Sequence, residues 1–267
     1  MAGANGVMAL GLPDDTFRRS VAALVLMPAA ILAVWAGTPF WEALVLAGAL
    51  VAGREWAAMA EPEAVRAFTA IPAVAAAVAL FSASAVVQGA VALGAALAAG
   101  LFLRRKTLAV GVLYIALPAM CLIALRRPEF GGLELAVWLF VVVWAGDIAA
   151  WWTGRRFGGP KLAPVWSPAK TWSGFVGGVA AAGLAGGAAS ALFVAPEVAG
   201  SGFAAGLLVG AAGVAGDLFE SACKRRFGVK DSGRLIPGHG GLLDRVDALL
   251  AGAAATMLLT AWGWRWT

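Results

Sequence analysis

Long apolar runs follow one another along almost the entire chain, interrupted only by short polar segments. Hydrophobic residues make up 61% of the 267 positions and charged residues only 13%, whereas a soluble globular domain carries about 25% charged residues. A helix needs about 20 apolar residues to cross the hydrocarbon core of a bilayer. The sequence therefore predicts an all-α, polytopic integral membrane protein, with a single domain over residues 1–267. We expect about nine spans, over residues 20–36, 40–53, 68–87, 89–103, 108–125, 133–153, 174–195, 202–222 and 247–264.

The distribution of Lys and Arg supports this count of spans. The second, fourth and last runs are the weakest, because they are short or rich in Ala and Gly, so eight spans are the alternative. Cytoplasmic loops of membrane proteins carry an excess of Lys and Arg. With nine spans and a cytoplasmic N-terminus, all but three of the 20 basic residues fall on the cytoplasmic side. We therefore expect N-terminal spans over residues 20–125 and a C-terminal part over residues 133–264, whose two longer loops, 154–173 and 223–246, lie in the cytoplasm and are the place to look for function.

The basic character of the chain does not indicate a nucleic-acid partner. The net charge is +5 and the pI about 9.8, but the basic residues lie between apolar runs and not in one solvated stripe. Anionic lipid head groups and nucleotide phosphates are the expected partners. Cys121 and Cys223 lie far apart in apolar surroundings, which indicates packing residues and neither a disulfide nor a metal site. Arg18 and Arg19 precede the first run without a convincing cleavage site, so we expect no cleaved signal peptide.

Acidic residues inside apolar runs are the first candidates for function. Asp147 lies in the run 133–153, and Asp217 and Glu220 lie near the end of the run 202–222. An ionisable side chain at the centre of a span costs roughly 2.5–3.5 kcal/mol to insert, so it normally faces a partner, a cation or a water-filled cavity. For Asp147 the alternative is a carboxylate that reaches the interface or pairs with Arg.

One face of the predicted helix over 202–222 is polar and continues into the following loop. Carboxylates for a hard cation, with a hydroxyl and an ammonium for phosphate oxygens, are the groups that nucleotidyl transfer requires. A simple salt bridge between Glu220 and Lys224 is the alternative for that pair. The residues of this face follow at i, i+3, i+4 and i+7: Asp217, Glu220, Ser221 and Lys224.

The loop 223–246 combines cations with glycines, which let backbone amides approach an anion closely. This combination suits a triphosphate. Its three glycines near the end are Gly238, Gly240 and Gly241. Its cations are Lys224, Arg225, Arg226, Lys230, Arg234 and Arg245.

Acidic residues and one histidine are interleaved with these cations. Asp231 lies within the loop, whereas Asp244 and Asp247 lie where the last helix starts, so either carboxylate could also act as a helix cap. His239 is the only histidine in the chain. We expect it to contact phosphate, because a phosphate monoester is already ionised at neutral pH and needs no general base.

The loop 154–173 is a second basic cluster. An excess of cytoplasmic charge and an interfacial Trp explain its Arg pair at 155–156 and Trp166. They do not explain the ordered string Ser-Pro-Ala-Lys-Thr that begins at Ser167. This string predicts a turn followed by the start of a helix near residues 172–174.

Residues 221–247 match a long motif at fixed spacing. The motif begins with Ser and Lys-Arg, continues with Lys-Asp, any residue and a small residue, and ends with His-Gly-Gly, Asp-Arg, an apolar residue and Asp; only Cys223, at an apolar position, departs from it. The strings GDLFES and KLAPVWSPAKTWSGFVGG match too, with Ser173 where Glu is usual. On these residues the chain resembles the phosphatidate cytidylyltransferase family over most of residues 140–250. A match of this length is specific, unlike a lone glycine motif.

The resemblance implies metal and substrate sites. It implies a divalent metal, Mg²⁺, on Asp217 and Asp244, and leaves open a second cation such as K⁺. The implied catalytic residues are Asp217, Asp244, Lys224, Asp231 and His239. The implied substrate-binding residues are Ser167, Lys170, Thr171, Ser221, Arg225, Lys230, Arg245 and Asp147.

The resemblance also implies the reaction and its location. The chain would transfer the cytidylyl group of CTP to phosphatidic acid, giving CDP-diacylglycerol and pyrophosphate for phospholipid biosynthesis, in a bacterial inner membrane with a cytoplasmic active site. A homodimer is a further expectation, from the small-residue helix faces. One alternative is a related enzyme for another lipid phosphate, such as an isoprenoid. The other is an ion-coupled transporter with Asp147 and Asp217 as ion sites, but that would place the carboxylates at the midplane instead of towards one face.

Overall fold

The structure is a computed structural model that describes residues 28, 30–82, 84–233, 235 and 240–264. Helices form almost all of this part of the chain, with one short hairpin between α7 and α8. Residues 30–36 are helical as well. The helices are α2 (Phe40–Ala60), α3 (Val65–Phe68), α4 (Ile71–Ala77), α5 (Ala85–Phe102), α6 (Lys106–Leu125), α7 (Gly132–Phe157), α8 (Trp172–Phe193), α9 (Ala199–Arg226) and α10 (Leu243–Ala261). Short 3₁₀ turns are η1 (Pro62–Ala64), η2 (Val78–Leu80), η3 (Pro128–Phe130) and η4 (Pro196–Val198), and the strands are β1 (Lys161–Ala163) and β2 (Ser167–Thr171).

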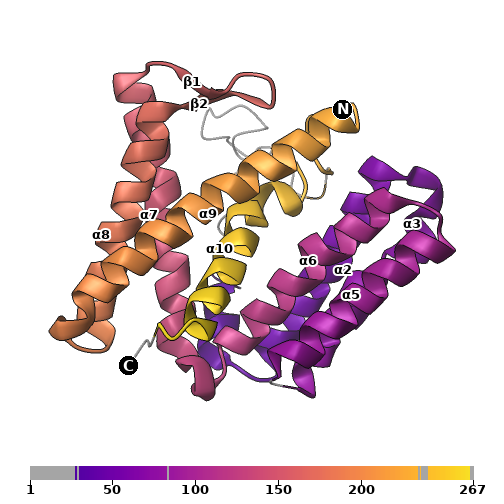
Figure 1. The fold of residues 1–267 in the computed structure, drawn as a ribbon, viewed down its shortest axis with the longest axis horizontal. Coiled ribbons are helices and arrows are strands. Elements are labelled where there is room, and N and C mark those ends of the chain that lie inside the picture. The colour runs from indigo at the N-terminus through magenta and orange to yellow at the C-terminus, as the bar shows by residue number, and fades with distance from the viewer. Residues whose placement is uncertain (1–27, 29, 83, 234, 236–239, 265–267) are drawn as a thin grey trace, which may run out of the picture.

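The helices form two groups that α10 joins (Figure 1). In the N-terminal group, α6 packs against α2, α4 and α5. In the C-terminal group, α8 packs against both α7 and α9. The last helix, α10, contacts α9 and α7 in one group and α6 in the other. The two halves of the chain therefore share one packed helix.

Five helical segments in the described part of the chain are long and apolar enough to cross a membrane. They confirm the predicted class, an all-α protein with several membrane-spanning helices, and they overlap five of the predicted spans. Of the other predicted spans, the one at α5 is shorter than these five segments, and α10, with 19 residues, is not among them. Most of the span 20–36 lies outside the described residues. The five segments are Phe40–Ala60, Lys106–Leu125, Gly132–Phe157, Trp172–Phe193 and Pro196–Arg226.

The predicted span over residues 68–87 is wrong as one continuous helix. The chain forms α3, α4 and η2 there, and then starts α5 at Ala85. The Ser84 hydroxyl accepts a hydrogen bond from the Val87 amide at 3.4 Å. A serine at this position provides an acceptor for one of the amides left free at a helix start. A hydropathy average over an apolar run hides a single serine, although this serine marks the boundary between two helices.

Glycines let the helices of the C-terminal group approach closely. A methyl group added at Gly206 of α9 would lie 2.5 Å from the Ala182 carbonyl oxygen of α8. One added at Gly174 of α8 would lie 2.9 Å from the Ala150 carbonyl oxygen of α7. Both distances are shorter than real methyl contacts, so only glycine fits without movement of the backbone. Small residues at helix interfaces suit a membrane protein, because lipid provides no hydrophobic force between helices.

We expect Gly206→Ala to destabilise the protein by about 1–3 kcal/mol, the usual effect of overpacking a close interface. Thermal unfolding in detergent measures this loss. Gly200→Ala is the matched control in the same helix, because nothing lies within 4 Å of a methyl group added there. It should be neutral or slightly stabilising, since Ala favours the helix over Gly. Equal melting temperatures for the two variants would contradict the close approach of α8 and α9.

The hairpin between α7 and α8 was not predicted. β1 and β2 pair antiparallel, with Lys161 opposite Thr171 and Ala163 opposite Ser167. Thr171 then caps α8, because its hydroxyl accepts a hydrogen bond from the Gly174 amide at 3.1 Å. The predicted helix start near residues 172–174 is confirmed.

Exposed aromatic side chains surround the end of α7 and α8 that carries the hairpin. Trp151, Trp152 and Trp172 are 64%, 56% and 51% exposed. The Arg155 guanidinium lies 5.6 Å from the centroid of the Trp151 ring. Tryptophan beside arginine is typical of the level at which lipid head groups meet water. This end of the bundle therefore has the composition of a membrane interface.

Candidate active site

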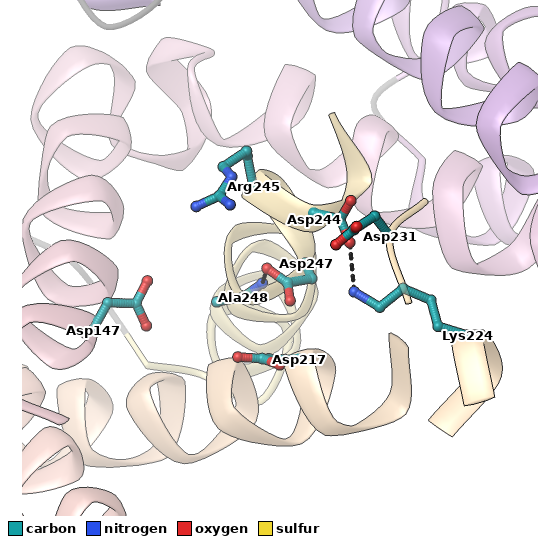
Figure 2. A pocket seen from close by; sticks show the side chains of 8 residues that line it. All are labelled: Asp147, Asp217, Lys224, Asp231, Asp244, Arg245, Asp247 and Ala248. Carbon is teal, nitrogen blue, oxygen red and sulfur yellow. Dashed lines mark hydrogen bonds and ion pairs between the residues drawn. The ribbon is translucent and has the colours of Figure 1, made fainter. Parts of the chain in front are cut away.

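A polar cavity of about 340 Å³ lies where α7, α9 and α10 meet the segment that precedes α10 (Figure 2). Most of its lining side chains are aspartates, and two are cations. These residues come from four separate parts of the chain, and they gather at the ends of α9 and α10 that face each other. The lining residues are Asp147, Asp217, Lys224, Asp231, Asp244, Arg245, Asp247 and Ala248.

The polar face predicted on α9 points towards this cavity and its surroundings. Asp217 lines the cavity, and its Oδ1 atom accepts a hydrogen bond from the Ser221 hydroxyl at 3.3 Å. One turn further, Lys224 pairs with Glu220 at 3.3 Å. The helical spacing therefore brings the four residues together as predicted.

Lys224 does more than form the simple salt bridge that was the alternative for it. Its ammonium also donates to Asp244 Oδ1 at 2.5 Å, so it connects α9 to α10. The three side chains are almost fully buried, at 12% for Lys224, 0% for Glu220 and 8% for Asp244. A largely buried cation between two carboxylates balances their negative charge, which water solvates only in part.

Asp244 is held in place by several donors besides Lys224. Its Oδ2 atom accepts hydrogen bonds from the Gly241 amide at 2.8 Å, the Ser232 amide at 2.8 Å and the Ser232 hydroxyl at 2.9 Å. Burial raises the pKa of this carboxyl, but the bonds from Lys224 and from the two amides outweigh burial, so its pKa lies below the usual value. Asp244 is therefore an ionised carboxylate at neutral pH.

The hairpin supplies a second lysine to the site. The Lys170 ammonium, from β2, forms a short ion pair with Asp217 Oδ2 on α9. Both side chains are partly exposed, at 25% and 34%. Each of the two carboxylates predicted to bind metal thus has a lysine ammonium against one of its oxygens.

Asp147 and Asp247 line the same cavity from α7 and α10. Asp147 is exposed on the wall formed by α7, and Figure 2 shows its carboxylate across the cavity from Asp217 and Asp247. Asp247 lies one turn after Asp244 on α10. The prediction that Asp147 faces a cavity and not lipid is therefore consistent with its position.

Six predicted substrate-binding residues are absent from the lining of this cavity, as far as the described residues show. Lys170 and Ser221 still contact Asp217, which lines it, but the other four lie elsewhere. Arg225 donates to the Val229 carbonyl oxygen at 3.2 Å, because one position along a helix turns a side chain away from the direction of Lys224. Thr171 is the cap of α8. Ser167 begins β2, and Lys230 is exposed. His239 lies outside the described residues, and its predicted role is untested.

Two residues that contact the site were missed in the sequence. Ser232 lies in the motif but at a position where any residue is allowed, and it donates twice to Asp244. Glu55 lies in α2, far from the motif, and accepts a hydrogen bond from the Ser232 hydroxyl at 3.2 Å. Glu55 follows the predicted run 40–53 and stands next to Arg54, so the signal that singled out Asp147, an acidic residue inside an apolar run, did not mark it.

The donors of the cavity fit a metal that binds together with a phosphate ligand. In the part of the chain that is described, no three His, Cys, Asp or Glu side chains are grouped closely enough to hold a metal alone. Magnesium is usually held by one or two carboxylates plus substrate phosphates. Asp217 and Asp244 provide such carboxylates. Each already has a cation, a lysine ammonium, against one of its two oxygens.

Fold and site together define a membrane-embedded protein with clustered carboxylates and lysines at the polar end of its helices. The chain belongs to the cytidylyltransferase family, which matches residues 17–262. The predicted resemblance is thereby confirmed.

Several bacterial relatives are named phosphatidate cytidylyltransferase. The relative from Brucella suis is 52% identical over 153 residues, which cover 57% of this chain and 56% of the relative. The relative from Pseudomonas aeruginosa is 40% identical over 177 residues, 60% of each chain. The relative from Haemophilus influenzae is 42% identical over 137 residues, 46% of this chain and 44% of the relative. The matched part of the chain thus spans about half the length of these relatives.

Proposed function

We propose that this protein transfers the cytidylyl group of CTP to phosphatidic acid, releasing CDP-diacylglycerol and pyrophosphate. Membership of the cytidylyltransferase family and the names of the relatives support the reaction class and both substrates. The observation that carries the proposal is the pairing of Lys170 and Lys224 with two carboxylates that line one cavity. Lysines and carboxylates in alternation suit a triphosphate and its metal.

In this reaction a phosphate oxygen of the lipid attacks the α-phosphorus of CTP, and the bond between that phosphorus and the bridging oxygen of the leaving pyrophosphate breaks. Two polyanions must approach each other, so neutralisation of charge is the main task of the site. Lys170, Lys224 and Arg245 would provide positive charge to the phosphates. No general base is needed, because a phosphate monoester with a second pKa of about 6 is largely ionised at neutral pH.

Asp217 and Asp244 would hold the magnesium ion, which would supply further positive charge at the phosphates. A lysine displaced from either carboxylate by the ion would be free to turn towards the phosphates of the substrate. Long, flexible lysine side chains permit such a change of partner. Asp147, Asp231 and Asp247 remain in the cavity wall as further oxygen donors.

The proposed membrane arrangement follows from the same features. Nine spans, with the cavity on the cytoplasmic side of the bacterial inner membrane, agree with the distribution of Lys and Arg. The span predicted over residues 68–87 would then be the shorter segment formed by α4 and η2. The exposed tryptophans near the hairpin support a position of the cavity close to the head groups. Phosphatidic acid would then present its phosphate to the cavity with its tails left in the bilayer. A homodimer remains part of the proposal through the glycine-rich helix faces.

The test is pyrophosphate release by the detergent-purified protein. With CTP, phosphatidic acid and Mg²⁺ all present, we expect release, and omission of any one should abolish it. An isoprenoid phosphate in place of phosphatidic acid separates the related enzyme from the proposed one. Folded protein that releases no pyrophosphate with any lipid phosphate would contradict the proposal, and ion flux in vesicles would then test the transporter.

A further inference from the structure

Glu55 is a buried carboxylate in the N-terminal half of the chain that contacts the start of α10. It is 7% exposed. Its Oε1 atom accepts a hydrogen bond from the Leu242 amide at 2.8 Å, and its Oε2 atom accepts one from the Leu243 amide at 2.9 Å. The first amides of a helix have no acceptor within the helix and favour a negative charge nearby. Glu55 therefore caps α10 from a helix about 190 residues earlier in the chain.

Ser232 connects this cap to Asp244. Its Oγ atom lies 3.2 Å from Glu55 Oε2 and 2.9 Å from Asp244 Oδ2. A hydroxyl has one proton, so it can donate to only one of the two carboxylates at a time. The Ser232 amide donates to Asp244 Oδ2 as well, at 2.8 Å. Ser232 thus lies between the two carboxylates and fixes their separation.

Two glycines of the sequence motif leave room for Glu55 and Ser232. A methyl group added at Gly233 would lie 2.9 Å from Glu55 Oε1, and one added at Gly241 would overlap Ser232 Oγ and lie 2.5 Å from Glu55 Oε2. Neither glycine has a positive φ, so backbone conformation does not require glycine at these positions. The space beside Gly233 is occupied by Glu55 and that beside Gly241 by Ser232 and Glu55, so larger residues would displace these side chains.

These contacts determine which oxygen of Asp244 faces its partners in the cavity. The Oδ2 atom is engaged by Ser232 and by the Gly241 amide. The Oδ1 atom is the one that meets the Lys224 ammonium. A carboxylate with one oxygen fixed in this way keeps the other in a constant direction.

We infer that Glu55 is a positioning residue: through the α10 amides and Ser232, it holds the Asp244 carboxylate in the orientation that the site uses. Its effect on catalysis rests on the proposed function, but its effect on the start of α10 does not. The N-terminal helices therefore contribute to the chemistry of the site without contacting its ligands.

Hydrogen exchange tests the structural part of this inference directly. The Leu242 and Leu243 amides each need an acceptor. In Glu55→Gln the side chain would present one acceptor oxygen and one NH₂ donor to them. We expect the amides of Leu242 and Leu243 to exchange at least about tenfold faster than in the wild type, because a hydrogen bond to a charged acceptor is lost. Glu61→Gln is the matched control, since Glu61 follows α2 but pairs with Arg105 and Thr107. Unchanged exchange in Glu55→Gln would overturn the inference.

The positioning of Asp244 is tested by the response to magnesium. We expect Glu55→Gln to lower kcat/KM by about 10- to 100-fold and to raise the magnesium concentration for half-maximal activity, as loss of a residue behind a metal ligand usually does. Ser232→Ala should show the same pattern, and the double variant should be little worse than either single one, because both act on one carboxylate. If Glu55→Gln does not fold, Ser232→Ala alone serves as the test.

The outcomes separate this inference from the proposed function. A lower melting temperature with wild-type kcat and magnesium response would mean that Glu55 is only structural, and would overturn the inference. If the wild type releases no pyrophosphate, the proposed function fails, and melting with and without Mg²⁺ and CTP replaces activity as the readout. A ligand-induced rise in melting temperature that is smaller in Glu55→Gln than in Glu61→Gln supports the inference; equal rises overturn it.

Discussion

Replacement of Asp217 by Asn is expected to lower kcat/KM for pyrophosphate release by more than about 100-fold. Loss of a residue behind a metal ligand costs about 10- to 100-fold, so loss of a ligand itself should exceed that range. Asn has the size of Asp and can still accept the hydrogen bond from Ser221, so the fold should persist. What is lost is the charge that pairs with Lys170 and would hold magnesium. Steady-state assays with increasing Mg²⁺ measure the loss.

Glu197→Gln is the matched control for Asp217→Asn. Glu197 lies in η4, just before α9, and is exposed at the opposite end of the same helical segment from Lys224. Its loss of charge should leave kcat/KM within about twofold of the wild type, as surface changes away from a site usually do. Activity of Asp217→Asn close to that of this control would contradict the assignment of Asp217 to the site.

Replacement of Lys224 by Met is expected to destabilise the protein by about 3–5 kcal/mol, the usual result of removing one partner from a buried ion pair. Lys224 lies between Glu220 and Asp244, and all three side chains are nearly inaccessible to water. Met fills a similar volume, so the loss reports on charge and not on packing. Thermal and denaturant unfolding in detergent measure it.

The pH dependence of this loss has a definite sign. The pKa of Asp244 lies below its usual value, largely through Lys224 and the amides that outweigh burial. Its ionised form therefore stabilises the wild type above about pH 4, the value for an unfolded Asp, and this contribution disappears as the pH falls further. The difference in the free energy of unfolding between the wild type and Lys224→Met should consequently become smaller in acid.

Lys170→Met is the comparison that distinguishes the two lysines. The pair of Lys170 with Asp217 is partly exposed, and such pairs contribute about 0–1 kcal/mol. We therefore expect little change in stability but a loss of activity, since Lys170 would contact the triphosphate. Equal destabilisation by both variants would contradict the difference in burial between the two ion pairs.

The sequence predicted much of the site because helical spacing is a local property. The positions of Asp217, Ser221 and Lys224 on one face of α9 follow from their separations alone. The proximity of Asp147 and Lys170 to Asp217 depends on how α7 and the hairpin pack on α9, and only the resemblance to a family suggested it. The apolar runs predicted the long helices because burial in lipid requires length and composition, both of which can be read directly.

The features that were missed depend on tertiary contacts or on short segments. Glu55 accepts hydrogen bonds from the backbone amides of residues about 190 positions away, and no local sequence pattern contains such a contact. The hairpin has a first strand of three residues, too few for an alternating pattern to show. The break before α5 is marked by Ser84, a single residue that has little effect on a hydropathy average over about 20 residues.

The tryptophans around the hairpin end of α7 and α8 have a consequence for kinetics. A site at the level of the head groups meets a lipid that moves in two dimensions, so the quantity that governs its encounter with the site is the mole fraction of that lipid in the surface and not its bulk concentration. Dilution of phosphatidic acid with an inert lipid or detergent, at constant total phosphatidic acid, should therefore slow turnover. CTP, the other proposed substrate, would arrive from water and follow ordinary volume concentration, so the two proposed substrates of one site would obey different laws of dilution.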